Sequence, residues 1–207
     1  MKLYYAPGAC SLSPHIVARE AGLTLDLERV DIGKHPHRTE TGVDFAAINP
    51  KGYVPALRLD DGQLLTEGAV IVQYLADLAP GSGLAPAAGT LERYRLQEWL
   101  AFISSELHKM FSPWLFHPEH GELAERAARA KIAERFAILD AHLAARPYLL
   151  GDKFTVADAY AFAIVGWPRP TRIDLALFPN LNRFMERVAT RPRVREAMRA
   201  EGLVTAA

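Results

Sequence analysis

The sequence predicts an α/β domain with a mixed four-stranded sheet, followed by an all-helical domain. Over residues 1–80, short strand patterns alternate with helical ones. The stretch Ala79–Pro86, rich in proline, glycine and serine, then interrupts this alternation. From Leu91 onward the hydrophobic periodicity is entirely helical. We therefore expect domains at residues 1–79 and 91–207, joined by a linker at residues 80–90.

Local signals set the elements of the first domain. Lys2–Tyr5 has the pattern of a strand, and a helix begins after it at Ser11, with serine caps and an early Pro14. Gly22 is expected to end that helix. The remaining expected elements are a strand at Leu25–Ile32, a loop at Gly33–Thr41, a short helix at Val43–Ile48, strands at Val54–Leu59 and Gln63–Leu65, and a helix at Gly68–Leu78.

The second domain shows only helical signals. Long helices are expected over Leu91–Phe111 and Glu122–Ala145. Thr155 and Asp158 have the spacing of a capping box and lead into a helix that is apolar on all sides. We expect this helix at the centre of the domain. Two closing helices are expected at Asn180–Ala189 and Arg193–Ala200.

Composition excludes several classes of protein. The 207 residues carry 24 basic and 24 acidic side chains, and this zero net charge argues against a nucleic-acid partner. A single cysteine excludes an intrachain disulfide framework and a cysteine-rich zinc site. The sequence shows neither a signal-peptide core nor an apolar run of the roughly 20 residues that a membrane span needs. We therefore expect a cytoplasmic protein.

The lone cysteine, Cys10, lies in a turn between a strand and a helix. The unpaired N–H groups and the dipole at a helix start favour a thiolate, either of Cys10 itself or of a bound ligand. A buried thiol that acts as a small hydrophobe is the alternative. Because the chain has no second cysteine, a redox role requires an external thiol.

Two further features suggest a binding site. Proline at position 55 opens a strand, where it suggests a special turn with a cis bond. An ordinary trans proline at the edge of the sheet is the alternative. Thr66-Glu67-Gly68 stands at a helix start, where N–H groups bind anions and the Glu67 carboxylate can hold an ammonium or complement the helix dipole. With Cys10, these features suit a short thiol peptide.

Five segments resemble the bacterial beta-class glutathione transferases, and the resemblance covers essentially the whole chain. It implies a thioredoxin-like first domain, glutathione as co-substrate, no metal, a role in detoxification and a homodimer. The five segments are Met1–His15, Ile48–Leu57, Leu65–Leu75, Ser104–Lys109 and Phe154–Tyr160.

The resemblance also implies roles for individual residues. Catalysis is expected of Cys10, Ser11 and His108. The residues expected to bind glutathione are Cys10, Lys34, His37, Tyr53, Val54, Pro55, Glu67, Gly68, Ser105, Glu106 and Lys109. Phe111, Trp114 and Phe116 are expected to line a pocket for an apolar electrophile, although most of this aromatic cluster reads as core. Thr155 and Asp158 are structural residues in the family.

Some alternatives stay open. The loop Gly33–Arg38 is longer than the family form, so Lys34, His37 and Arg38 all compete to bind the glycyl carboxylate of glutathione. Conjugation competes with a Cys10-dependent redox reaction, peroxide reduction or dehalogenation as the main activity. A non-catalytic binding protein on the same fold is a further alternative, although the presence of Cys10 and Glu67 counts against it.

Overall fold

The chain forms two units, which the computed structural model describes over residues 1–167, 171 and 173–205. The first unit consists of Met1–Ala85 together with Thr190–Ala207, and the second is Pro86–Ala189. The division at Ala85 lies inside the expected linker. The C-terminal segment, in contrast, belongs with the first unit and not with the helical one.

A mixed sheet is the frame of the first unit. Its strands are β1 (Lys2–Tyr5), β2 (Asp26–Asp31), β3 (Arg38–Thr39), β4 (Ala56–Arg58) and β5 (Leu64–Thr66), in the order β3-β2-β1-β4-β5. Only the β1–β2 pair is parallel. The expected mixed sheet is confirmed, but it has five strands instead of four. The extra strand, β3, forms inside the segment expected to be loop, because it pairs with β2.

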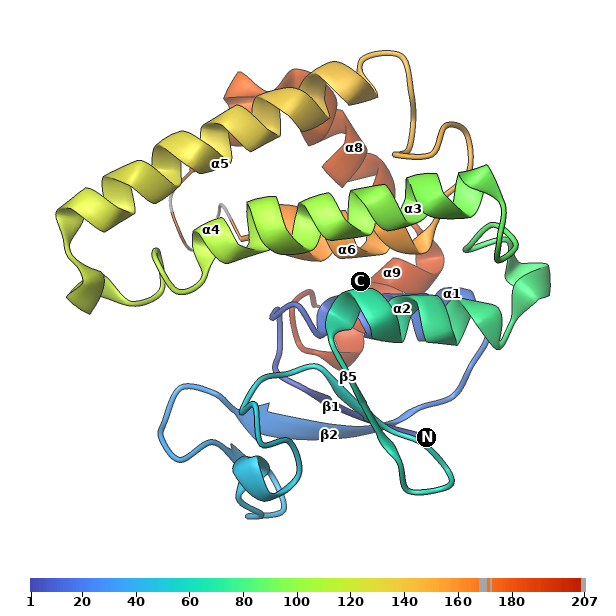
Figure 1. Cartoon of the computed structure of the whole chain (residues 1–207), viewed down its shortest axis with the longest axis vertical. Coiled ribbons are helices and arrows are strands. Elements are labelled where there is room, and N and C mark those ends of the chain that lie inside the picture. The colour runs from blue at the N-terminus through green and yellow to red at the C-terminus, as the bar shows by residue number, and fades with distance from the viewer. Residues whose placement is uncertain (168–170, 172, 206–207) are drawn as a thin grey trace. The chain divides into compact units, whose positions relative to one another are not determined.

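Three helices pack together beside this sheet (Figure 1): α1 (Leu12–Glu20), α2 (Gly68–Asp77) and α9 (Pro192–Ala200). Each helix buries apolar residues, and Ile16 of α1 and Leu75 of α2 are fully buried. The predicted stop of α1 is confirmed at Gly22, which has φ +70°. The N–H group of Leu23 donates to the Ala18 carbonyl at 2.8 Å and closes the helix end.

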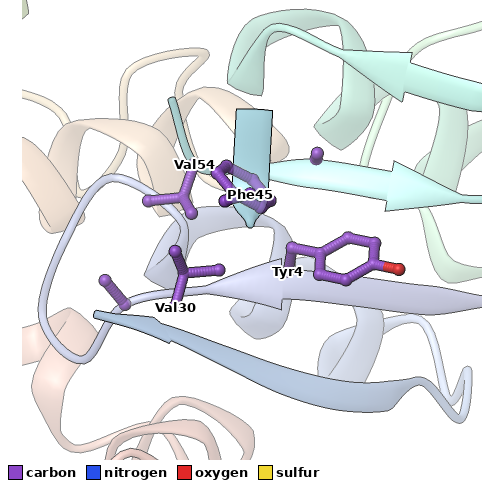
Figure 2. Packing of buried hydrophobic residues seen from close by; sticks show 6 residues of the cluster. Tyr4, Val30, Phe45 and Val54 are labelled. Atoms are coloured by element: carbon purple, nitrogen blue, oxygen red, sulfur yellow. The ribbon is translucent and has the colours of Figure 1, made fainter. Parts of the chain in front are cut away.

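A separate cluster of buried side chains lies between the sheet and the segment that follows β3. Figure 2 shows Tyr4, Val30, Phe45 and Val54 packed together. Phe45 begins a 3₁₀-helix, η1 (Phe45–Ala47), at the position of the expected short helix. The ring centroids of Tyr4 and Phe45 are 5.7 Å apart. This cluster anchors the segment leading to Val54, a residue of the candidate site.

The place of α9 in the first unit has a clear physical cause. Val194 and Ala197 of α9 are fully buried, and α9 packs against α1. Just before α9, the Arg191 guanidinium binds both carboxylate oxygens of Glu20 at 2.7 and 2.8 Å. A bidentate pair of this kind fixes direction as well as distance. Sequence periodicity identifies α9 as a helix but cannot say which domain covers its apolar side.

The second unit is helical. Among its described residues, the helices are α3 (Leu91–Phe102), α4 (Lys109–Phe111), α5 (Glu122–Leu143), α6 (Val156–Val165) and α8 (Pro179–Ala189), with short 3₁₀ turns η4 (Pro118–His120) and η5 (Leu175–Leu177). A further 3₁₀ turn, η2 (Pro80–Ser82), belongs to the first unit. Every residue of α6 is buried, so the prediction of an all-apolar central helix is confirmed.

The first long helix of this unit is less regular than its periodicity predicts. Between α3 and α4 it widens into a π-helical segment, η3 (Ile103–His108). The hydroxyls of Ser104 and Ser105 donate to the Ala101 carbonyl at 3.1 and 2.8 Å. Side-chain bonds of this type compete with the backbone ladder. The π segment carries three of the residues expected in the active site.

The predicted capping box at the start of α6 is confirmed. One carboxylate oxygen of Asp158 accepts from the N–H and the hydroxyl of Thr155 at 2.8 and 2.9 Å. The other oxygen accepts from the Leu149 N–H at 2.8 Å, so the box also holds the preceding loop. Burial raises the pKa of Asp158 from 3.8 to about 6, although these hydrogen bonds favour the charged form.

This pKa predicts a pH-dependent contribution to stability. In the unfolded chain Asp158 loses its proton near its ordinary pKa, whereas the folded protein keeps it up to about pH 6. The unfolded state therefore binds fewer protons between about pH 4 and about pH 6, and stability falls as the pH rises through this window. Asp158→Asn does not titrate. We expect the free energy of unfolding of this variant to lie below that of wild type, and the difference to shrink by on the order of 1–3 kcal/mol from about pH 4 to about pH 7.

Chemical denaturation at several pH values measures this difference. Asp152→Asn is the matched control, because Asp152 lies exposed in the loop before the same helix. A deficit of Asp158→Asn that stays constant over the window, or an equal trend in the control, contradicts the prediction.

Candidate functional site

The register of three strands brings the candidate residues of the first unit together. Tyr4 of β1 pairs with Ala56 of β4, and Ala56 pairs with Thr66 of β5. Because these pairs are antiparallel, the end of β1 lies beside the start of β4 and the end of β5. Cys10 comes after the end of β1, Val54 comes just before β4, and Glu67 directly follows β5. The sheet therefore places them in one region.

Cys10 is half-buried in the turn that joins β1 to α1. Its Sγ donates to the Val54 carbonyl at 3.3 Å. The Ser13 hydroxyl donates to the Cys10 carbonyl at 2.7 Å and fixes the backbone of the turn. A thiol at the start of a nine-residue helix lies where the helix dipole stabilises a negative sulfur.

Ser11 does not form the expected side-chain cap of α1. It is fully buried. Its hydroxyl instead accepts from the Ala6 N–H and donates to the Ala6 carbonyl, both at 3.1 Å. Sequence alone favours serine as a cap because it cannot show this closer partner across the turn. Ser11 thus holds the Cys10 turn closed.

Val54 and Pro55 lie directly opposite this turn. The Val54–Pro55 bond is cis, one of the two forms that the sequence left open. Pro55 packs against the start of α2, since a Cβ placed on Gly68 would lie 3.6 Å from the Pro55 Cγ. The bond leaves the Val54 carbonyl directed at the Cys10 sulfur. Cys10, Pro55 and Gly68 are therefore neighbours.

Glu67 stands at the far end of this row and has an unusual backbone. Its φ is +70°, and among the described non-glycine residues it alone has a positive φ. Lys51 Nζ lies 2.7 Å from the Glu67 carboxylate and 3.1 Å from the Thr66 hydroxyl. Both side chains of the ion pair are more than half exposed, so they are available to a ligand. Lys51 is a site residue that the sequence motifs did not single out.

The residues of the 33–38 loop separate in the structure. His37 Nδ1 lies 3.0 Å from the Gly52 carbonyl, close in sequence to Lys51, and its ring stacks on His35 at 4.3 Å. Arg38 donates to the Gly42 carbonyl within its own loop. Lys34 is exposed. Of the three candidates for a carboxylate ligand, His37 is therefore attached to the Lys51 segment.

Tyr53 contributes to the same segment through its backbone. Its side chain is 67% exposed, while its carbonyl accepts from the Asn49 side-chain amide at 2.7 Å. Asn49 is buried, so this bond fixes the chain just before Val54. The ring of Tyr53 therefore lies at the surface.

In the second unit, the residues expected to bind glutathione or to act in catalysis lie in η3 and at the start of α4. The Ser105 hydroxyl donates to its own helix, and Glu106 pairs with Arg135 of α5 at 2.7 Å. His108 Nδ1 lies 2.8 Å from the Tyr160 hydroxyl, and its ring meets Trp167 edge-on at 5.0 Å. Lys109 is exposed at the start of α4.

The three expected electrophile-pocket aromatics have different environments. Phe111 is fully buried between Phe136 and Trp167, which makes it a core residue instead of a pocket wall. Trp114 lines an almost wholly apolar pocket of about 260 Å³, together with Met110, Ala124, Ala127, Ala128 and Lys131. Phe116 is 42% exposed and meets Trp167 edge-on. Helical spacing alone does not separate these environments.

No helix in the described ranges is long and apolar enough to cross a membrane. No group of three or more histidine, cysteine or acidic side chains there is arranged to hold a metal ion.

Comparisons with known proteins identify the family of the chain. The N-terminal domain model of the glutathione S-transferases matches residues 8–78, and the C-terminal domain model matches residues 102–192. Glutathione S-transferase GstA of Escherichia coli O157:H7 is 44% identical over 98% of this chain and 100% of its own. The chain belongs to the glutathione S-transferase family. Within that family it is a bacterial beta-class enzyme.

Solved structures give the same result. A ternary complex of BphK, a bacterial glutathione S-transferase, has a TM-score of 0.95 and 53% identity, covering 98% of this chain and 100% of its own. A sphingomonad glutathione S-transferase complexed with glutathione has a TM-score of 0.93 and 46% identity, covering 99% of this chain and 100% of its own.

The positive φ of Glu67 predicts that this residue lowers the stability of the folded protein. A non-glycine residue at φ +70° is held there by its surroundings at an energetic cost. We expect Glu67→Gly to raise the free energy of unfolding by about 1 kcal/mol, since glycine adopts this φ freely. Lys51→Met, which removes the exposed ion pair without touching this backbone, should change it by less than about 1 kcal/mol.

Denaturant titration measures both values. A loss of stability in Glu67→Gly larger than that in Lys51→Met contradicts the strain argument.

Proposed function

We propose that this enzyme binds glutathione along the row formed by Cys10, Val54, Pro55, Gly68 and Glu67, and conjugates its thiol to apolar electrophiles. The observation that carries the proposal is the continuous arrangement of these residues in the first unit. The Cys10 sulfur contacts the Val54 carbonyl, and Pro55 packs against Gly68, next to Glu67. Each part of this row matches one part of a γ-glutamyl thiol peptide.

The thiol end of glutathione lies beside Cys10 in this proposal. The helix dipole at the start of α1 stabilises a negative sulfur there. Each pKa unit by which a thiol is lowered adds about 1.4 kcal/mol of preference for the thiolate. The backbone of Val54 is the proposed partner for the cysteinyl unit, whose contact replaces the one between the Val54 carbonyl and the Cys10 thiol.

The γ-glutamyl end of the ligand carries both an ammonium and a carboxylate. Glu67 supplies an anion for the ammonium, while Lys51 and the first N–H groups of α2 supply positive charge for the carboxylate. An incoming zwitterion thus replaces the Lys51–Glu67 contact with two contacts of the same kind. For the glycyl carboxylate we propose His37, which is attached to the Lys51 segment through Gly52.

In the reaction, the glutathione thiolate attacks an electrophilic carbon. With an aryl halide, a C–S bond forms, the C–halogen bond breaks, and halide leaves with the electron pair. The apolar pocket lined by Trp114 and the exposed side of Phe116 are the proposed contacts for the electrophile in the second unit. Ser105, Glu106 and Lys109 remain proposed glutathione contacts, and Ser11 and His108 remain proposed catalytic residues. The homodimer and the cytoplasmic location stay predictions.

Steady-state conjugation of a chromogenic aryl halide tests the proposal. Loss of the charge in Glu67→Gln is expected to raise the KM for glutathione about tenfold and to change kcat much less, because a charge-assisted contact is lost in both ground and transition states. Glu92→Gln is the matched control, since Glu92 is an exposed acid in the first turn of another helix.

A wild-type enzyme with no glutathione-dependent rate above background refutes conjugation for that substrate class. Equal rises in KM in both variants would remove Glu67 from the binding site.

A Cys10-dependent redox reaction is the second candidate, favoured by the position of this thiol at a helix start. There, the Cys10 thiolate attacks a disulfide that contains glutathione, forms a mixed disulfide and releases the other thiol. We expect Cys10→Ala to abolish glutathione-dependent disulfide exchange while conjugation keeps about a tenth or more of its rate. Parallel assays of the two reactions, with the exposed Glu92→Gln as control, separate the candidates. Loss of both reactions would make Cys10 essential to conjugation as well.

A further inference from the structure

A buried ionisable pair lies in the first unit, outside the proposed glutathione contacts. His15 of α1 is 1% exposed, and Glu201, which follows α9, is 6% exposed. His15 Nδ1 and a Glu201 carboxylate oxygen are 2.9 Å apart. Buried ionisable pairs contribute little net stability on average, so a position of this kind calls for another explanation.

The second carboxylate oxygen of Glu201 contacts the turn that carries Cys10, which explains the buried pair. It accepts from the Gly8 N–H at 2.9 Å, across 193 residues of sequence. Gly8 belongs to the turn that carries Cys10, and its φ of +70° is one that glycine adopts easily. The Leu203 side chain covers Gly8, because a Cβ placed there would lie 3.3 Å from the Leu203 Cδ2. The C-terminal segment therefore supports this turn by a hydrogen bond and by packing.

The end of α9 places Glu201 for this contact. Gly202 has φ +71°, and the N–H of Leu203 donates to the Met198 carbonyl at 2.8 Å. This is the hydrogen bond of a Schellman motif, which reverses the chain immediately after Glu201. Glu201 and Leu203 consequently both face the turn at Gly8.

His15 orients the carboxylate. Its Nδ1 contacts Glu201, whereas its Nε2 is buried with no hydrogen-bond partner among the described residues. The tautomer with the proton on Nδ1 leaves no buried N–H group unpaired, so Nδ1 donates to Glu201. The negative charge is also felt nearby: after burial, Glu201 is the next largest cause of the raised pKa of Tyr5.

From this geometry we infer that Glu201 is a positioning residue for Cys10: its carboxylate, oriented by His15, holds the Pro7–Cys10 turn at Gly8. The turn then keeps the Cys10 sulfur at the Val54 carbonyl. The inference rests on the proposed function only for the catalytic use of Cys10. The contact itself is testable without glutathione.

The experiment compares Glu201→Ala and Glu201→Gln with Glu196→Ala in the ligand-free full-length protein. Glu196 is the matched control, because it lies on the same helix and pairs with Arg193 at the surface. Hydrogen–deuterium exchange reports the Gly8 N–H, and alkylation by iodoacetamide reports Cys10, the one cysteine of the chain. Circular dichroism establishes which variants are folded.

In Glu201→Ala we expect exchange at Gly8 to rise about tenfold, because its N–H loses the acceptor. Alkylation of Cys10 should rise about threefold, since a loosened thiol no longer donates to Val54. Glu201→Gln should give exchange and alkylation rates between those of wild type and Glu201→Ala, because an amide keeps one acceptor oxygen. Glu196→Ala should give the rates of wild type. In a conjugation assay, Glu201→Ala should lower kcat more than it raises the KM for glutathione, since the Glu67 end is unchanged.

Unchanged Gly8 exchange and Cys10 alkylation in folded Glu201→Ala would overturn the inference, as would equal changes in Glu196→Ala. If Glu201→Ala does not fold, Glu201→Gln decides: exchange at Gly8 above wild type supports the inference, and exchange equal to wild type rejects it. These readouts need no glutathione, so failure of conjugation alone would reject the proposed function and leave this inference standing.

Discussion

The antiparallel pairing of β1 with β4 is the constraint on which the rest of the site depends. Tyr4 lies opposite Ala56, and Ala56 lies opposite Thr66, so three strand ends meet at one place. Cys10 reaches the Val54 carbonyl only in this register. A slip by one residue would turn buried Leu3 and Tyr4 to the wrong faces of the sheet, which is why the core enforces the register.

Around this centre, most polar groups of the Cys10 turn are used to hold the backbone. Ser11 closes the turn on Ala6, Ser13 bonds the Cys10 carbonyl, and Glu201 accepts from Gly8. The thiol is thus presented by a rigid frame whose parts come from both ends of the chain. Rigid support of this kind keeps a reacting sulfur in place without spending substrate binding energy on it.

Much of the fold and part of the site were predictable from local signals. The strand at β1, the glycine stop of α1, the capping box at Asp158 and the buried helix α6 all follow from the residues themselves. The position of Cys10 at a helix start also follows from short-range sequence, whereas the residues around Pro55 left a cis and a trans bond open. Such features depend on neighbours a few residues apart, and backbone sterics decide them.

By itself, the sequence determined most of the helices and strands, the family and the motif residues. Only the tertiary structure decided that Phe111 is core, that Lys51 meets Glu67, and that α9 with Glu201 joins the first unit. It also added β3 to the sheet. The physical reason is range. Periodicity shows that a side chain is apolar or that a carboxylate is present, but burial and pairing across as many as 193 residues depend on packing of the whole unit.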